Sequence, residues 1–242
     1  MLEHNTQKAR STPSNLAKNR ARVYHLLSLL YIRPPDKALL KTLKSWIHAV
    51  IESLRVYESL PNHMSKGLNS MYIFLEDMDD RSLEFLSVEF TRLFRGLKPS
   101  KSPLPPYESL YRGEKLVFGE TTIEVYKKYR YFNLIPVDRF KGDPPDHIAF
   151  ELDFMRFLCS KEGEAWNKGD RNEVLKLLNA ERNFVREHLI KWIRKLCEKI
   201  KLFDATGFYK ALADLTEGWI DIDHEQITTC IEAMKYGIDN LS

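Results

Sequence analysis

The sequence predicts an all-α protein: a single-domain bundle of about nine to eleven helices, in which a proline-rich connector joins two helix groups. Apolar residues recur at intervals of three, four and seven along most of the chain, the pattern of helices with one buried face. No β-branched run bounded by turn residues is long enough for a strand. Hydrophobic residues make up 43% of the chain and charged residues 29%, as in ordinary globular domains.

The first helix group is expected within residues 14–96, after a polar N-terminal tail at residues 1–13. Two prolines end its first helix, and Asp36 can cap the second, because a carboxylate accepts hydrogen bonds from the free amides of a first turn. The apolar stripes that define its helices span residues 16–31, 39–57, 68–78 and 83–94.

The connector is predicted at residues 97–120. Four prolines lie between Gly96 and Pro106, and proline cannot continue a helix and biases its predecessor toward extended geometry. We expect an ordered loop or an extended crossing segment here. The chain from residue 14 to residue 242 would then form one helical domain, with the connector between its two groups.

The second helix group, residues 121–242, is expected to begin with a short aromatic helix that Thr121 or Thr122 caps. After a second break with two prolines, Asp146 stands where an N-cap residue should, and His147 would lie in the first turn of the next helix. The later helices are expected at residues 147–159, 170–200, 208–219 and 227–234.

Composition narrows the class of protein. The formal net charge of +3 gives no nucleic-acid-binding stripe. The three cysteines are widely spaced and form no CxxC pair, so neither a disulfide framework nor a zinc site is predicted, and a reducing compartment fits best. No apolar run reaches about 18 residues, and no signal-peptide hydrophobic region is present. We therefore expect a cytoplasmic protein that is not an integral membrane protein.

Three segments are candidates for a functional site: residues 89–94, 105–111 and 146–152. The second reads P-P-Y-E-S-L-Y. Its prolines pre-order a loop, and its tyrosines offer flat apolar contact with polar tips. This loop is interpreted either as a rigid connector packed on the core or as one wall of a groove that binds an apolar peptide.

Acidic residues gather near the start of the third segment, where no Lys or Arg interrupts them. They are Asp143, Asp146, Glu151 and Asp153. If Tyr107 and Glu108 lie close to them, the result is an aromatic site with an acidic rim, which prefers a peptide with Arg beside a hydrophobic stretch. A solvated acidic helix start is the alternative interpretation.

Two other classes of function stay open. His147 and Glu151 lie one helical turn apart and could serve a metal-dependent hydrolase, although no further histidine stands at ligand spacing. Neither a GxSxG element nor a glycine-rich phosphate loop is present. A basic stretch with Lys18, Arg20 and Arg22 could instead serve a helical nucleic-acid-binding regulator, although the overall charge argues against it.

In their order and spacing, the three segments resemble the TorD/DmsD/NarJ-like redox-enzyme maturation chaperones. The family pattern is E-x-x-R-L-F, then P-P-Y-x-S-x-Y, then P-D-H-x-x-x-E-L-x-F-M, and residues 89–94, 105–111 and 145–155 match it. The resemblance covers roughly residues 15–239. Further matches lie at Phe184, His188, Leu189, Trp192, Phe208, Tyr209 and residues 212–215.

The resemblance implies a cytoplasmic chaperone without catalysis, cofactor or metal. It implies binding of the twin-arginine signal peptide of a molybdopterin-containing oxidoreductase, which delays export until the cofactor is inserted. Residue matching places the peptide site at Tyr107, Glu108, Ser109, Tyr111, Asp146 and His147. The matched supporting positions are Glu89, Leu93, Phe94, Pro106 and Glu151.

Two departures from the family pattern affect the edge of this site. Many members have Trp where Tyr107 stands and Gly where Glu108 stands, so the contact made there differs. The connector would also permit two chains to exchange helix groups, so either a monomer or a domain-swapped dimer is compatible with the sequence.

Overall fold

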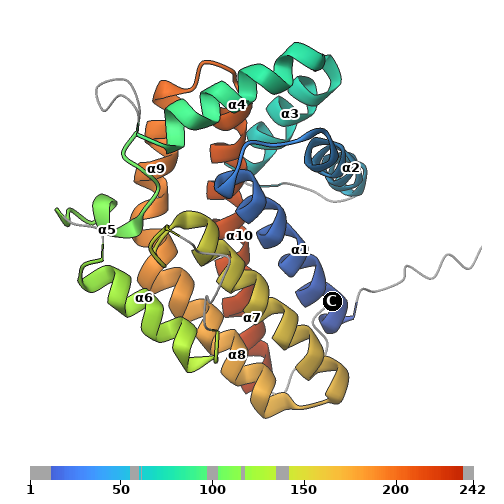
Figure 1. Ribbon diagram of the computed structural model, residues 1–242. Helices are drawn as coiled ribbons and strands as arrows, with labels where there is room; N and C mark the ends of the chain where they lie inside the picture. Colours follow the sequence, from blue (N-terminus) through green and yellow to red (C-terminus); the bar gives the residue numbers. More distant parts are fainter. Residues whose placement is uncertain are drawn as a thin grey trace, which may run out of the picture.

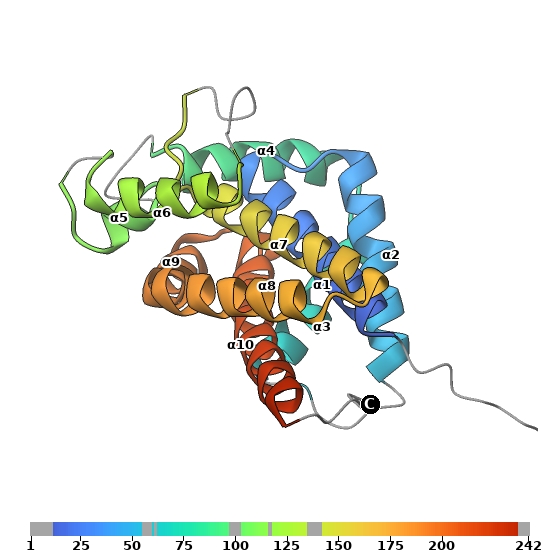
Figure 2. The same cartoon turned by 90° about the horizontal axis from the view of Figure 1, so that it is seen from below.

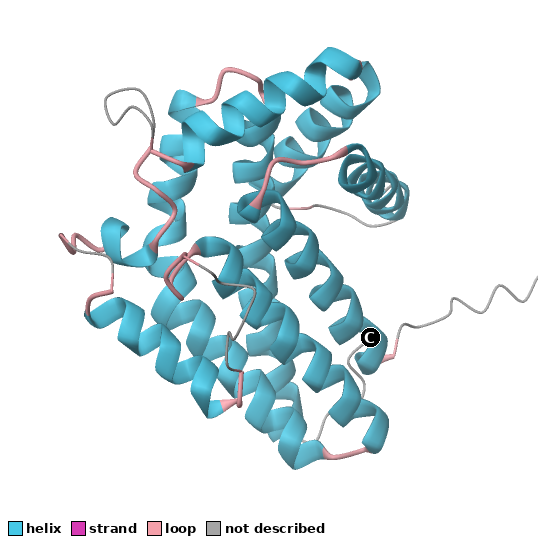
Figure 3. Cartoon of the chain, in the orientation of Figure 1, coloured by secondary structure: helices cyan, strands magenta, loops and turns pink. Residues whose placement is uncertain are grey.

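The computed structural model describes residues 12–54, 60, 62–96, 103–115, 118–134 and 142–236. These residues form ten α-helices and one π-helical turn, and they contain no β-strand, so the predicted all-α class is confirmed (Figure 3). The elements are α1 (Pro13–Ile32), α2 (Lys37–Leu54), α3 (Asn62–Asp77), α4 (Asp80–Phe94), α5 (Glu108–Tyr111), α6 (Glu120–Tyr131), α7 (Ile148–Lys168), α8 (Arg171–Phe184), η1 (Val185–Leu189), α9 (Ile190–Phe203) and α10 (Phe208–Lys235).

Helices far apart in the sequence pack side by side. α1 lies along α7, and α3 lies along α10 (Figure 1). α10 also packs on α8 and α9, and α7 packs on α8, which Figure 2 shows from below. Helices from before and after the proline-rich connector therefore share one hydrophobic core. Among the described helices, none has the length and apolar content that a membrane span requires.

Two glycines allow α3 and α10 to approach closely. A Cβ atom added at Gly218 would lie 2.7 Å from the backbone nitrogen of Met64, and one added at Gly67 would lie 2.7 Å from the backbone nitrogen of Leu215. Both distances are far below van der Waals contact, so larger residues would push the helices apart. The absence of side chains at these two positions therefore sets the spacing of this helix pair.

A buried ion cluster fastens α1 to three later helices. The guanidinium of Arg20 donates to Glu162 on α7 over 2.7 Å, and also to Glu181 on α8 and Asp223 on α10. The hydroxyl of Tyr24 donates to the same Asp223 over 2.6 Å. Arg20 is only 7% exposed. The nucleic-acid alternative placed this residue on a basic surface, and that placement is wrong.

Several expected helix boundaries differ from the structure. The helix predicted over residues 170–200 is interrupted by η1, because a π turn adds a residue that apolar periodicity does not reveal. The last two predicted helices are one helix, α10. Asp223 lies between their apolar stripes, but its side chain faces the interior and meets Arg20, so the polar residue marks no break.

Candidate functional site

An isolated antiparallel bridge between Tyr107 and His147 joins the proline-rich loop to the start of α7. The backbone nitrogen of Glu108 donates to the carbonyl of Asp146, and that of Ile148 donates to the carbonyl of Pro106, each over 2.9 Å. The structure therefore brings together the second and third candidate segments, residues 105–111 and 146–152. The contact between the proline-rich loop and the start of α7 is called the loop junction. Pro106 takes part through its carbonyl oxygen.

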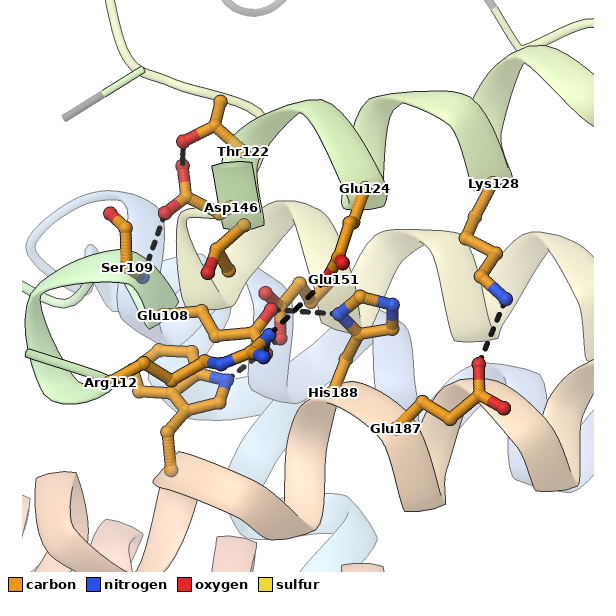
Figure 4. Close-up of polar contacts among 12 residues, drawn as sticks. Glu108, Ser109, Arg112, Thr122, Glu124, Lys128, Asp146, Glu151, Glu187 and His188 are labelled. Atoms are coloured by element: carbon orange, nitrogen blue, oxygen red, sulfur yellow. Dashed lines mark hydrogen bonds and ion pairs between the residues drawn. The ribbon is translucent and has the colours of Figure 1, made fainter. Parts of the chain in front are cut away.

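Asp146 does not cap α7, which corrects the prediction made from its position. Its fully buried carboxylate accepts from the backbone nitrogen of Ser109 over 3.0 Å and from Oγ1 of Thr122 over 2.9 Å (Figure 4). The N-cap is the next residue, His147, whose Nδ1 accepts from the backbone nitrogen of Ala149 over 3.1 Å. Asp146 instead ties α5 and α6 to the start of α7.

His147 is neutral at physiological pH. Burial lowers the pKa of its imidazole to about 4, with Asp143 opposing that shift and Arg95 adding to it. A neutral ring matches the geometry, because Nδ1 must be unprotonated to accept the hydrogen bond that caps α7. The ring also meets Tyr107 edge to face, with centroids 5.2 Å apart.

Tyr107 is the half-buried aromatic residue at the edge of the site. Its hydroxyl donates to Oδ1 of Asp143 over 2.5 Å, and burial together with this carboxylate raises the pKa of Tyr107. Arg95, just after α4, lies 3.6 Å from the other oxygen of Asp143. Leu104 nearby is 51% exposed, and its carbonyl accepts from the hydroxyl of Tyr111 over 2.9 Å. Leu104, Tyr107 and Asp143 are thus among the residues of this loop junction that solvent reaches.

Glu108 and Glu151 are buried inside the protein, as Asp146 is. The expected position of these three residues on an acidic rim is therefore wrong. Glu108 accepts from Arg112 over 3.1 Å, and its other oxygen lies 2.9 Å from Nδ1 of His188 (Figure 4). Glu151 accepts from Nε1 of Trp192 over 3.1 Å. Burial and the neighbouring Glu108 raise the pKa of Glu151 well above its ordinary value, which favours its uncharged form.

Two of the predicted contact residues are also enclosed. Ser109 is fully buried, and its Oγ has no hydrogen-bond partner among the described residues. Tyr111 packs against Trp192, with ring centroids 5.5 Å apart. Most of the predicted peptide-binding side chains are therefore buried within the loop junction. Their role in binding stays a prediction.

The first segment, at the end of α4, lies against a different part of the molecule. Glu89 accepts from the backbone nitrogen of Ala205 over 2.8 Å and from Arg92, so it fastens α4 to the turn between α9 and α10. Leu93 and Phe94 are core residues. α4 instead reaches the loop junction through the Arg95–Asp143 contact described above.

The hydrolase alternative finds no support in this geometry. Nδ1 of His147 caps its own helix, and Glu151 faces Trp192. Within the described part of the chain, two groups of side chains have the spacing of metal ligands: His63 with Asp214 and Glu217, and Cys159 with Glu162 and Glu181. Neither contains His147 or Glu151. Each group already binds a cation of the protein, Lys201 in the first and Arg20 in the second.

Sequence reasoning missed several residues of the junction. The sequence predicts no role at the site for His188 or Trp192. Thr122 was expected as a helix cap, but α6 begins after Gly119 and the Thr122 hydroxyl serves Asp146. The available signal was the family match at His188 and Trp192, four residues apart on neighbouring turns.

The fold and the junction define an all-helical protein of one domain, in which a proline-rich loop lies on the start of a central helix. The family model described as nitrate reductase delta subunit matches residues 58–198, and the chain belongs to that family. The resemblance stated from the motifs is thereby confirmed.

Similar proteins extend this comparison over most of the chain. Chaperone protein TorD of Vibrio parahaemolyticus is 30% identical over 207 residues, which cover 85% of this chain and 93% of that protein. Chaperone protein TorD of Vibrio cholerae is 27% identical over 222 residues, or 90% of this chain and 96% of that protein. Chaperone protein TorD of Shewanella sp. strain MR-4 is 28% identical over 227 residues, or 90% and 99%.

Proposed function

We propose that this protein is a cytoplasmic chaperone, without catalytic activity, for the assembly of a molybdopterin-containing oxidoreductase. It binds the twin-arginine signal peptide of the catalytic subunit and delays export until the cofactor is inserted. The observation that carries the proposal is similarity to proteins named Chaperone protein TorD over nearly their whole length.

The loop junction supports this function through its chemistry. Tyr107 and Leu104 offer partly exposed aromatic and aliphatic surface for the apolar stretch of a signal peptide. The side chain of Asp143 is 22% exposed and provides a carboxylate at the same edge for a guanidinium group. The buried contacts of Asp146 hold the loop in place before any peptide arrives, which lowers the entropic cost of binding.

The direct test is a calorimetric titration of the full chain with the twin-arginine leader of a molybdopterin-dependent oxidoreductase from the same operon. We expect Tyr107→Ala to weaken binding about tenfold or more without unfolding the protein. Tyr131→Ala is the matched control, because Tyr131 is 71% exposed at the end of α6. Equal losses of affinity and thermal stability in the Tyr107 variant would favour a role in core packing.

A second experiment tests the role in the cell. In a strain that lacks the gene, we expect reduced activity of the exported oxidoreductase, restored by the wild-type chain. A titration in which no such leader binds, together with normal oxidoreductase maturation in the deletion strain, would refute the proposal.

A further inference from the structure

His188 reaches the loop junction from an irregular part of a helix. It belongs to η1, the π-helical turn between α8 and α9, and it is 2% exposed. A π turn inserts a residue and so rotates the following side chains about the helix axis, and such turns occur frequently at functional sites. In this turn Nδ1 of His188 lies 2.9 Å from Oε2 of Glu108, and the ring packs on Phe184 with centroids 4.8 Å apart.

Glu108 is the other half of this pair. It is the first residue of α5, a helix of four residues whose N-cap residue, Tyr107, makes no capping hydrogen bond with its side chain, and it is 0% exposed. A buried carboxylate is costly unless it is paired and hydrogen-bonded. Arg112 provides the pairing over 3.1 Å, and His188 provides the hydrogen bond (Figure 4). Burial and the neighbouring Glu108 raise the pKa of Glu151, which lies beside them, and so favour its uncharged form.

The contacts of the loop include two attachments to parts of the chain that are far apart in the sequence. The bridge at Tyr107 and the carboxylate of Asp146 tie it to the start of α7, its neighbour in the junction. The Glu108–His188 pair ties it to the junction of α8 and α9, about 80 residues further along the chain. The stacking of Tyr111 on Trp192 lies on the same side. The second attachment therefore contributes to the orientation of the loop relative to the main helices.

We propose that Glu108 and His188 are positioning residues: their buried pair fixes α5 against the α8–α9 junction and so holds Tyr107 in the orientation that a bound peptide meets. The identity of the ligand rests on the proposed function. Both side chains are buried, so they act through Tyr107 and do not contact the peptide themselves.

The test compares His188→Leu with His188→Asn, measured by titration with the twin-arginine leader and by thermal denaturation. The asparagine amide places a donor near the position of Nδ1, whereas leucine fills the space without one. We expect the leucine variant to bind the leader about tenfold more weakly and the asparagine variant to stay within about threefold of wild type. His224→Leu on α10 is the matched control and should leave the affinity unchanged.

Amide hydrogen exchange of the peptide-free protein gives a readout that does not depend on the ligand. We expect His188→Leu to speed exchange at the amides of Glu108, Ser109 and Ile148, which form the bridge and the Asp146 contact, and to leave α1 protected. Glu108→Gln, which preserves the shape of the side chain, should have the same effect if the leucine variant fails to fold.

Two results would overturn this inference. One is that His188→Leu binds the leader with wild-type affinity. The other is that His188→Leu and His188→Asn both lose affinity, in parallel with their loss of thermal stability. If the wild-type chain binds no leader at all, the proposed function fails, and the hydrogen-exchange experiment alone tests the positioning role of Glu108 and His188. Unchanged exchange at the three junction amides would then refute the positioning role.

Discussion

Protonation of His147 should remove the N-cap of α7. Its Nδ1 accepts the hydrogen bond from Ala149, and an imidazolium has no lone pair to accept it. The charged ring would also lie buried at the positive end of the helix dipole. The variant His147→Asn keeps a favourable N-cap oxygen and removes the titrating group. It therefore isolates the effect of this one proton.

The sign and size follow from the pKa. The folded protein holds the pKa of His147 at about 4, below the ordinary 6.5, so the folded state binds fewer protons than the unfolded state between these values. The stabilisation is therefore fully present above about pH 6.5 and is lost as the pH falls toward 4. At 1.36 kcal/mol per pH unit, the loss is on the order of 3 kcal/mol.

Urea denaturation between pH 7 and pH 4 measures this loss. Over that range, the free energy of unfolding should fall further in wild type than in His147→Asn, by on the order of 3 kcal/mol. Carboxylates that titrate in the same range affect both proteins equally, so the difference between the two curves reports His147. Parallel curves for wild type and His147→Asn would show that the imidazole titrates normally and that the capping argument is mistaken.

Two further predictions concern the core. Gly218→Ala should lower the free energy of unfolding by about 1 to 3 kcal/mol, because the new Cβ atom would lie 2.7 Å from the rigid backbone of Met64. Urea denaturation measures this loss. Gly163→Ala, whose new Cβ atom would have its nearest contact at 3.3 Å, should lower the free energy of unfolding by less. Burial raises the pKa of Glu181 to about 8, so the folded state holds a proton that the unfolded state releases, and stability should fall as the pH rises from about 4.5 to 8. Glu181→Gln should flatten that decline in thermal denaturation, and an equal decline in both proteins would contradict the assignment.

Much of the fold could be predicted because helices leave a local signal. Apolar spacing located the principal helices, and Asp36 does cap α2, with one oxygen 2.8 Å from the backbone nitrogen of Leu39. Where polar residues face inward, this signal misleads. Asp223 is buried against Arg20 within α10, where the sequence predicts two separate helices.

The site was harder to predict because its partners are distant in sequence. Asp146 and His147 are both capable N-caps, and the choice between them depends on donors from Ser109 and Thr122 that only the folded chain brings near. The grouping of the loop with the start of α7 was anticipated from the motifs. The π turn that directs His188 to Glu108 leaves no pattern in hydrophobicity, so this contact could not be read from the chain.

The Arg20 cluster also bears on the order in which the chain can fold during synthesis. The three acidic side chains that bind Arg20 lie at residues 162, 181 and 223, so a ribosome must release most of the chain before the last of them is available. Until then the guanidinium has no complete set of partners, and its burial with α1 is unfavourable. α1 is thus synthesised early, but its buried contacts through Arg20 form late. The domain therefore completes its folding only after nearly all of it has been synthesised.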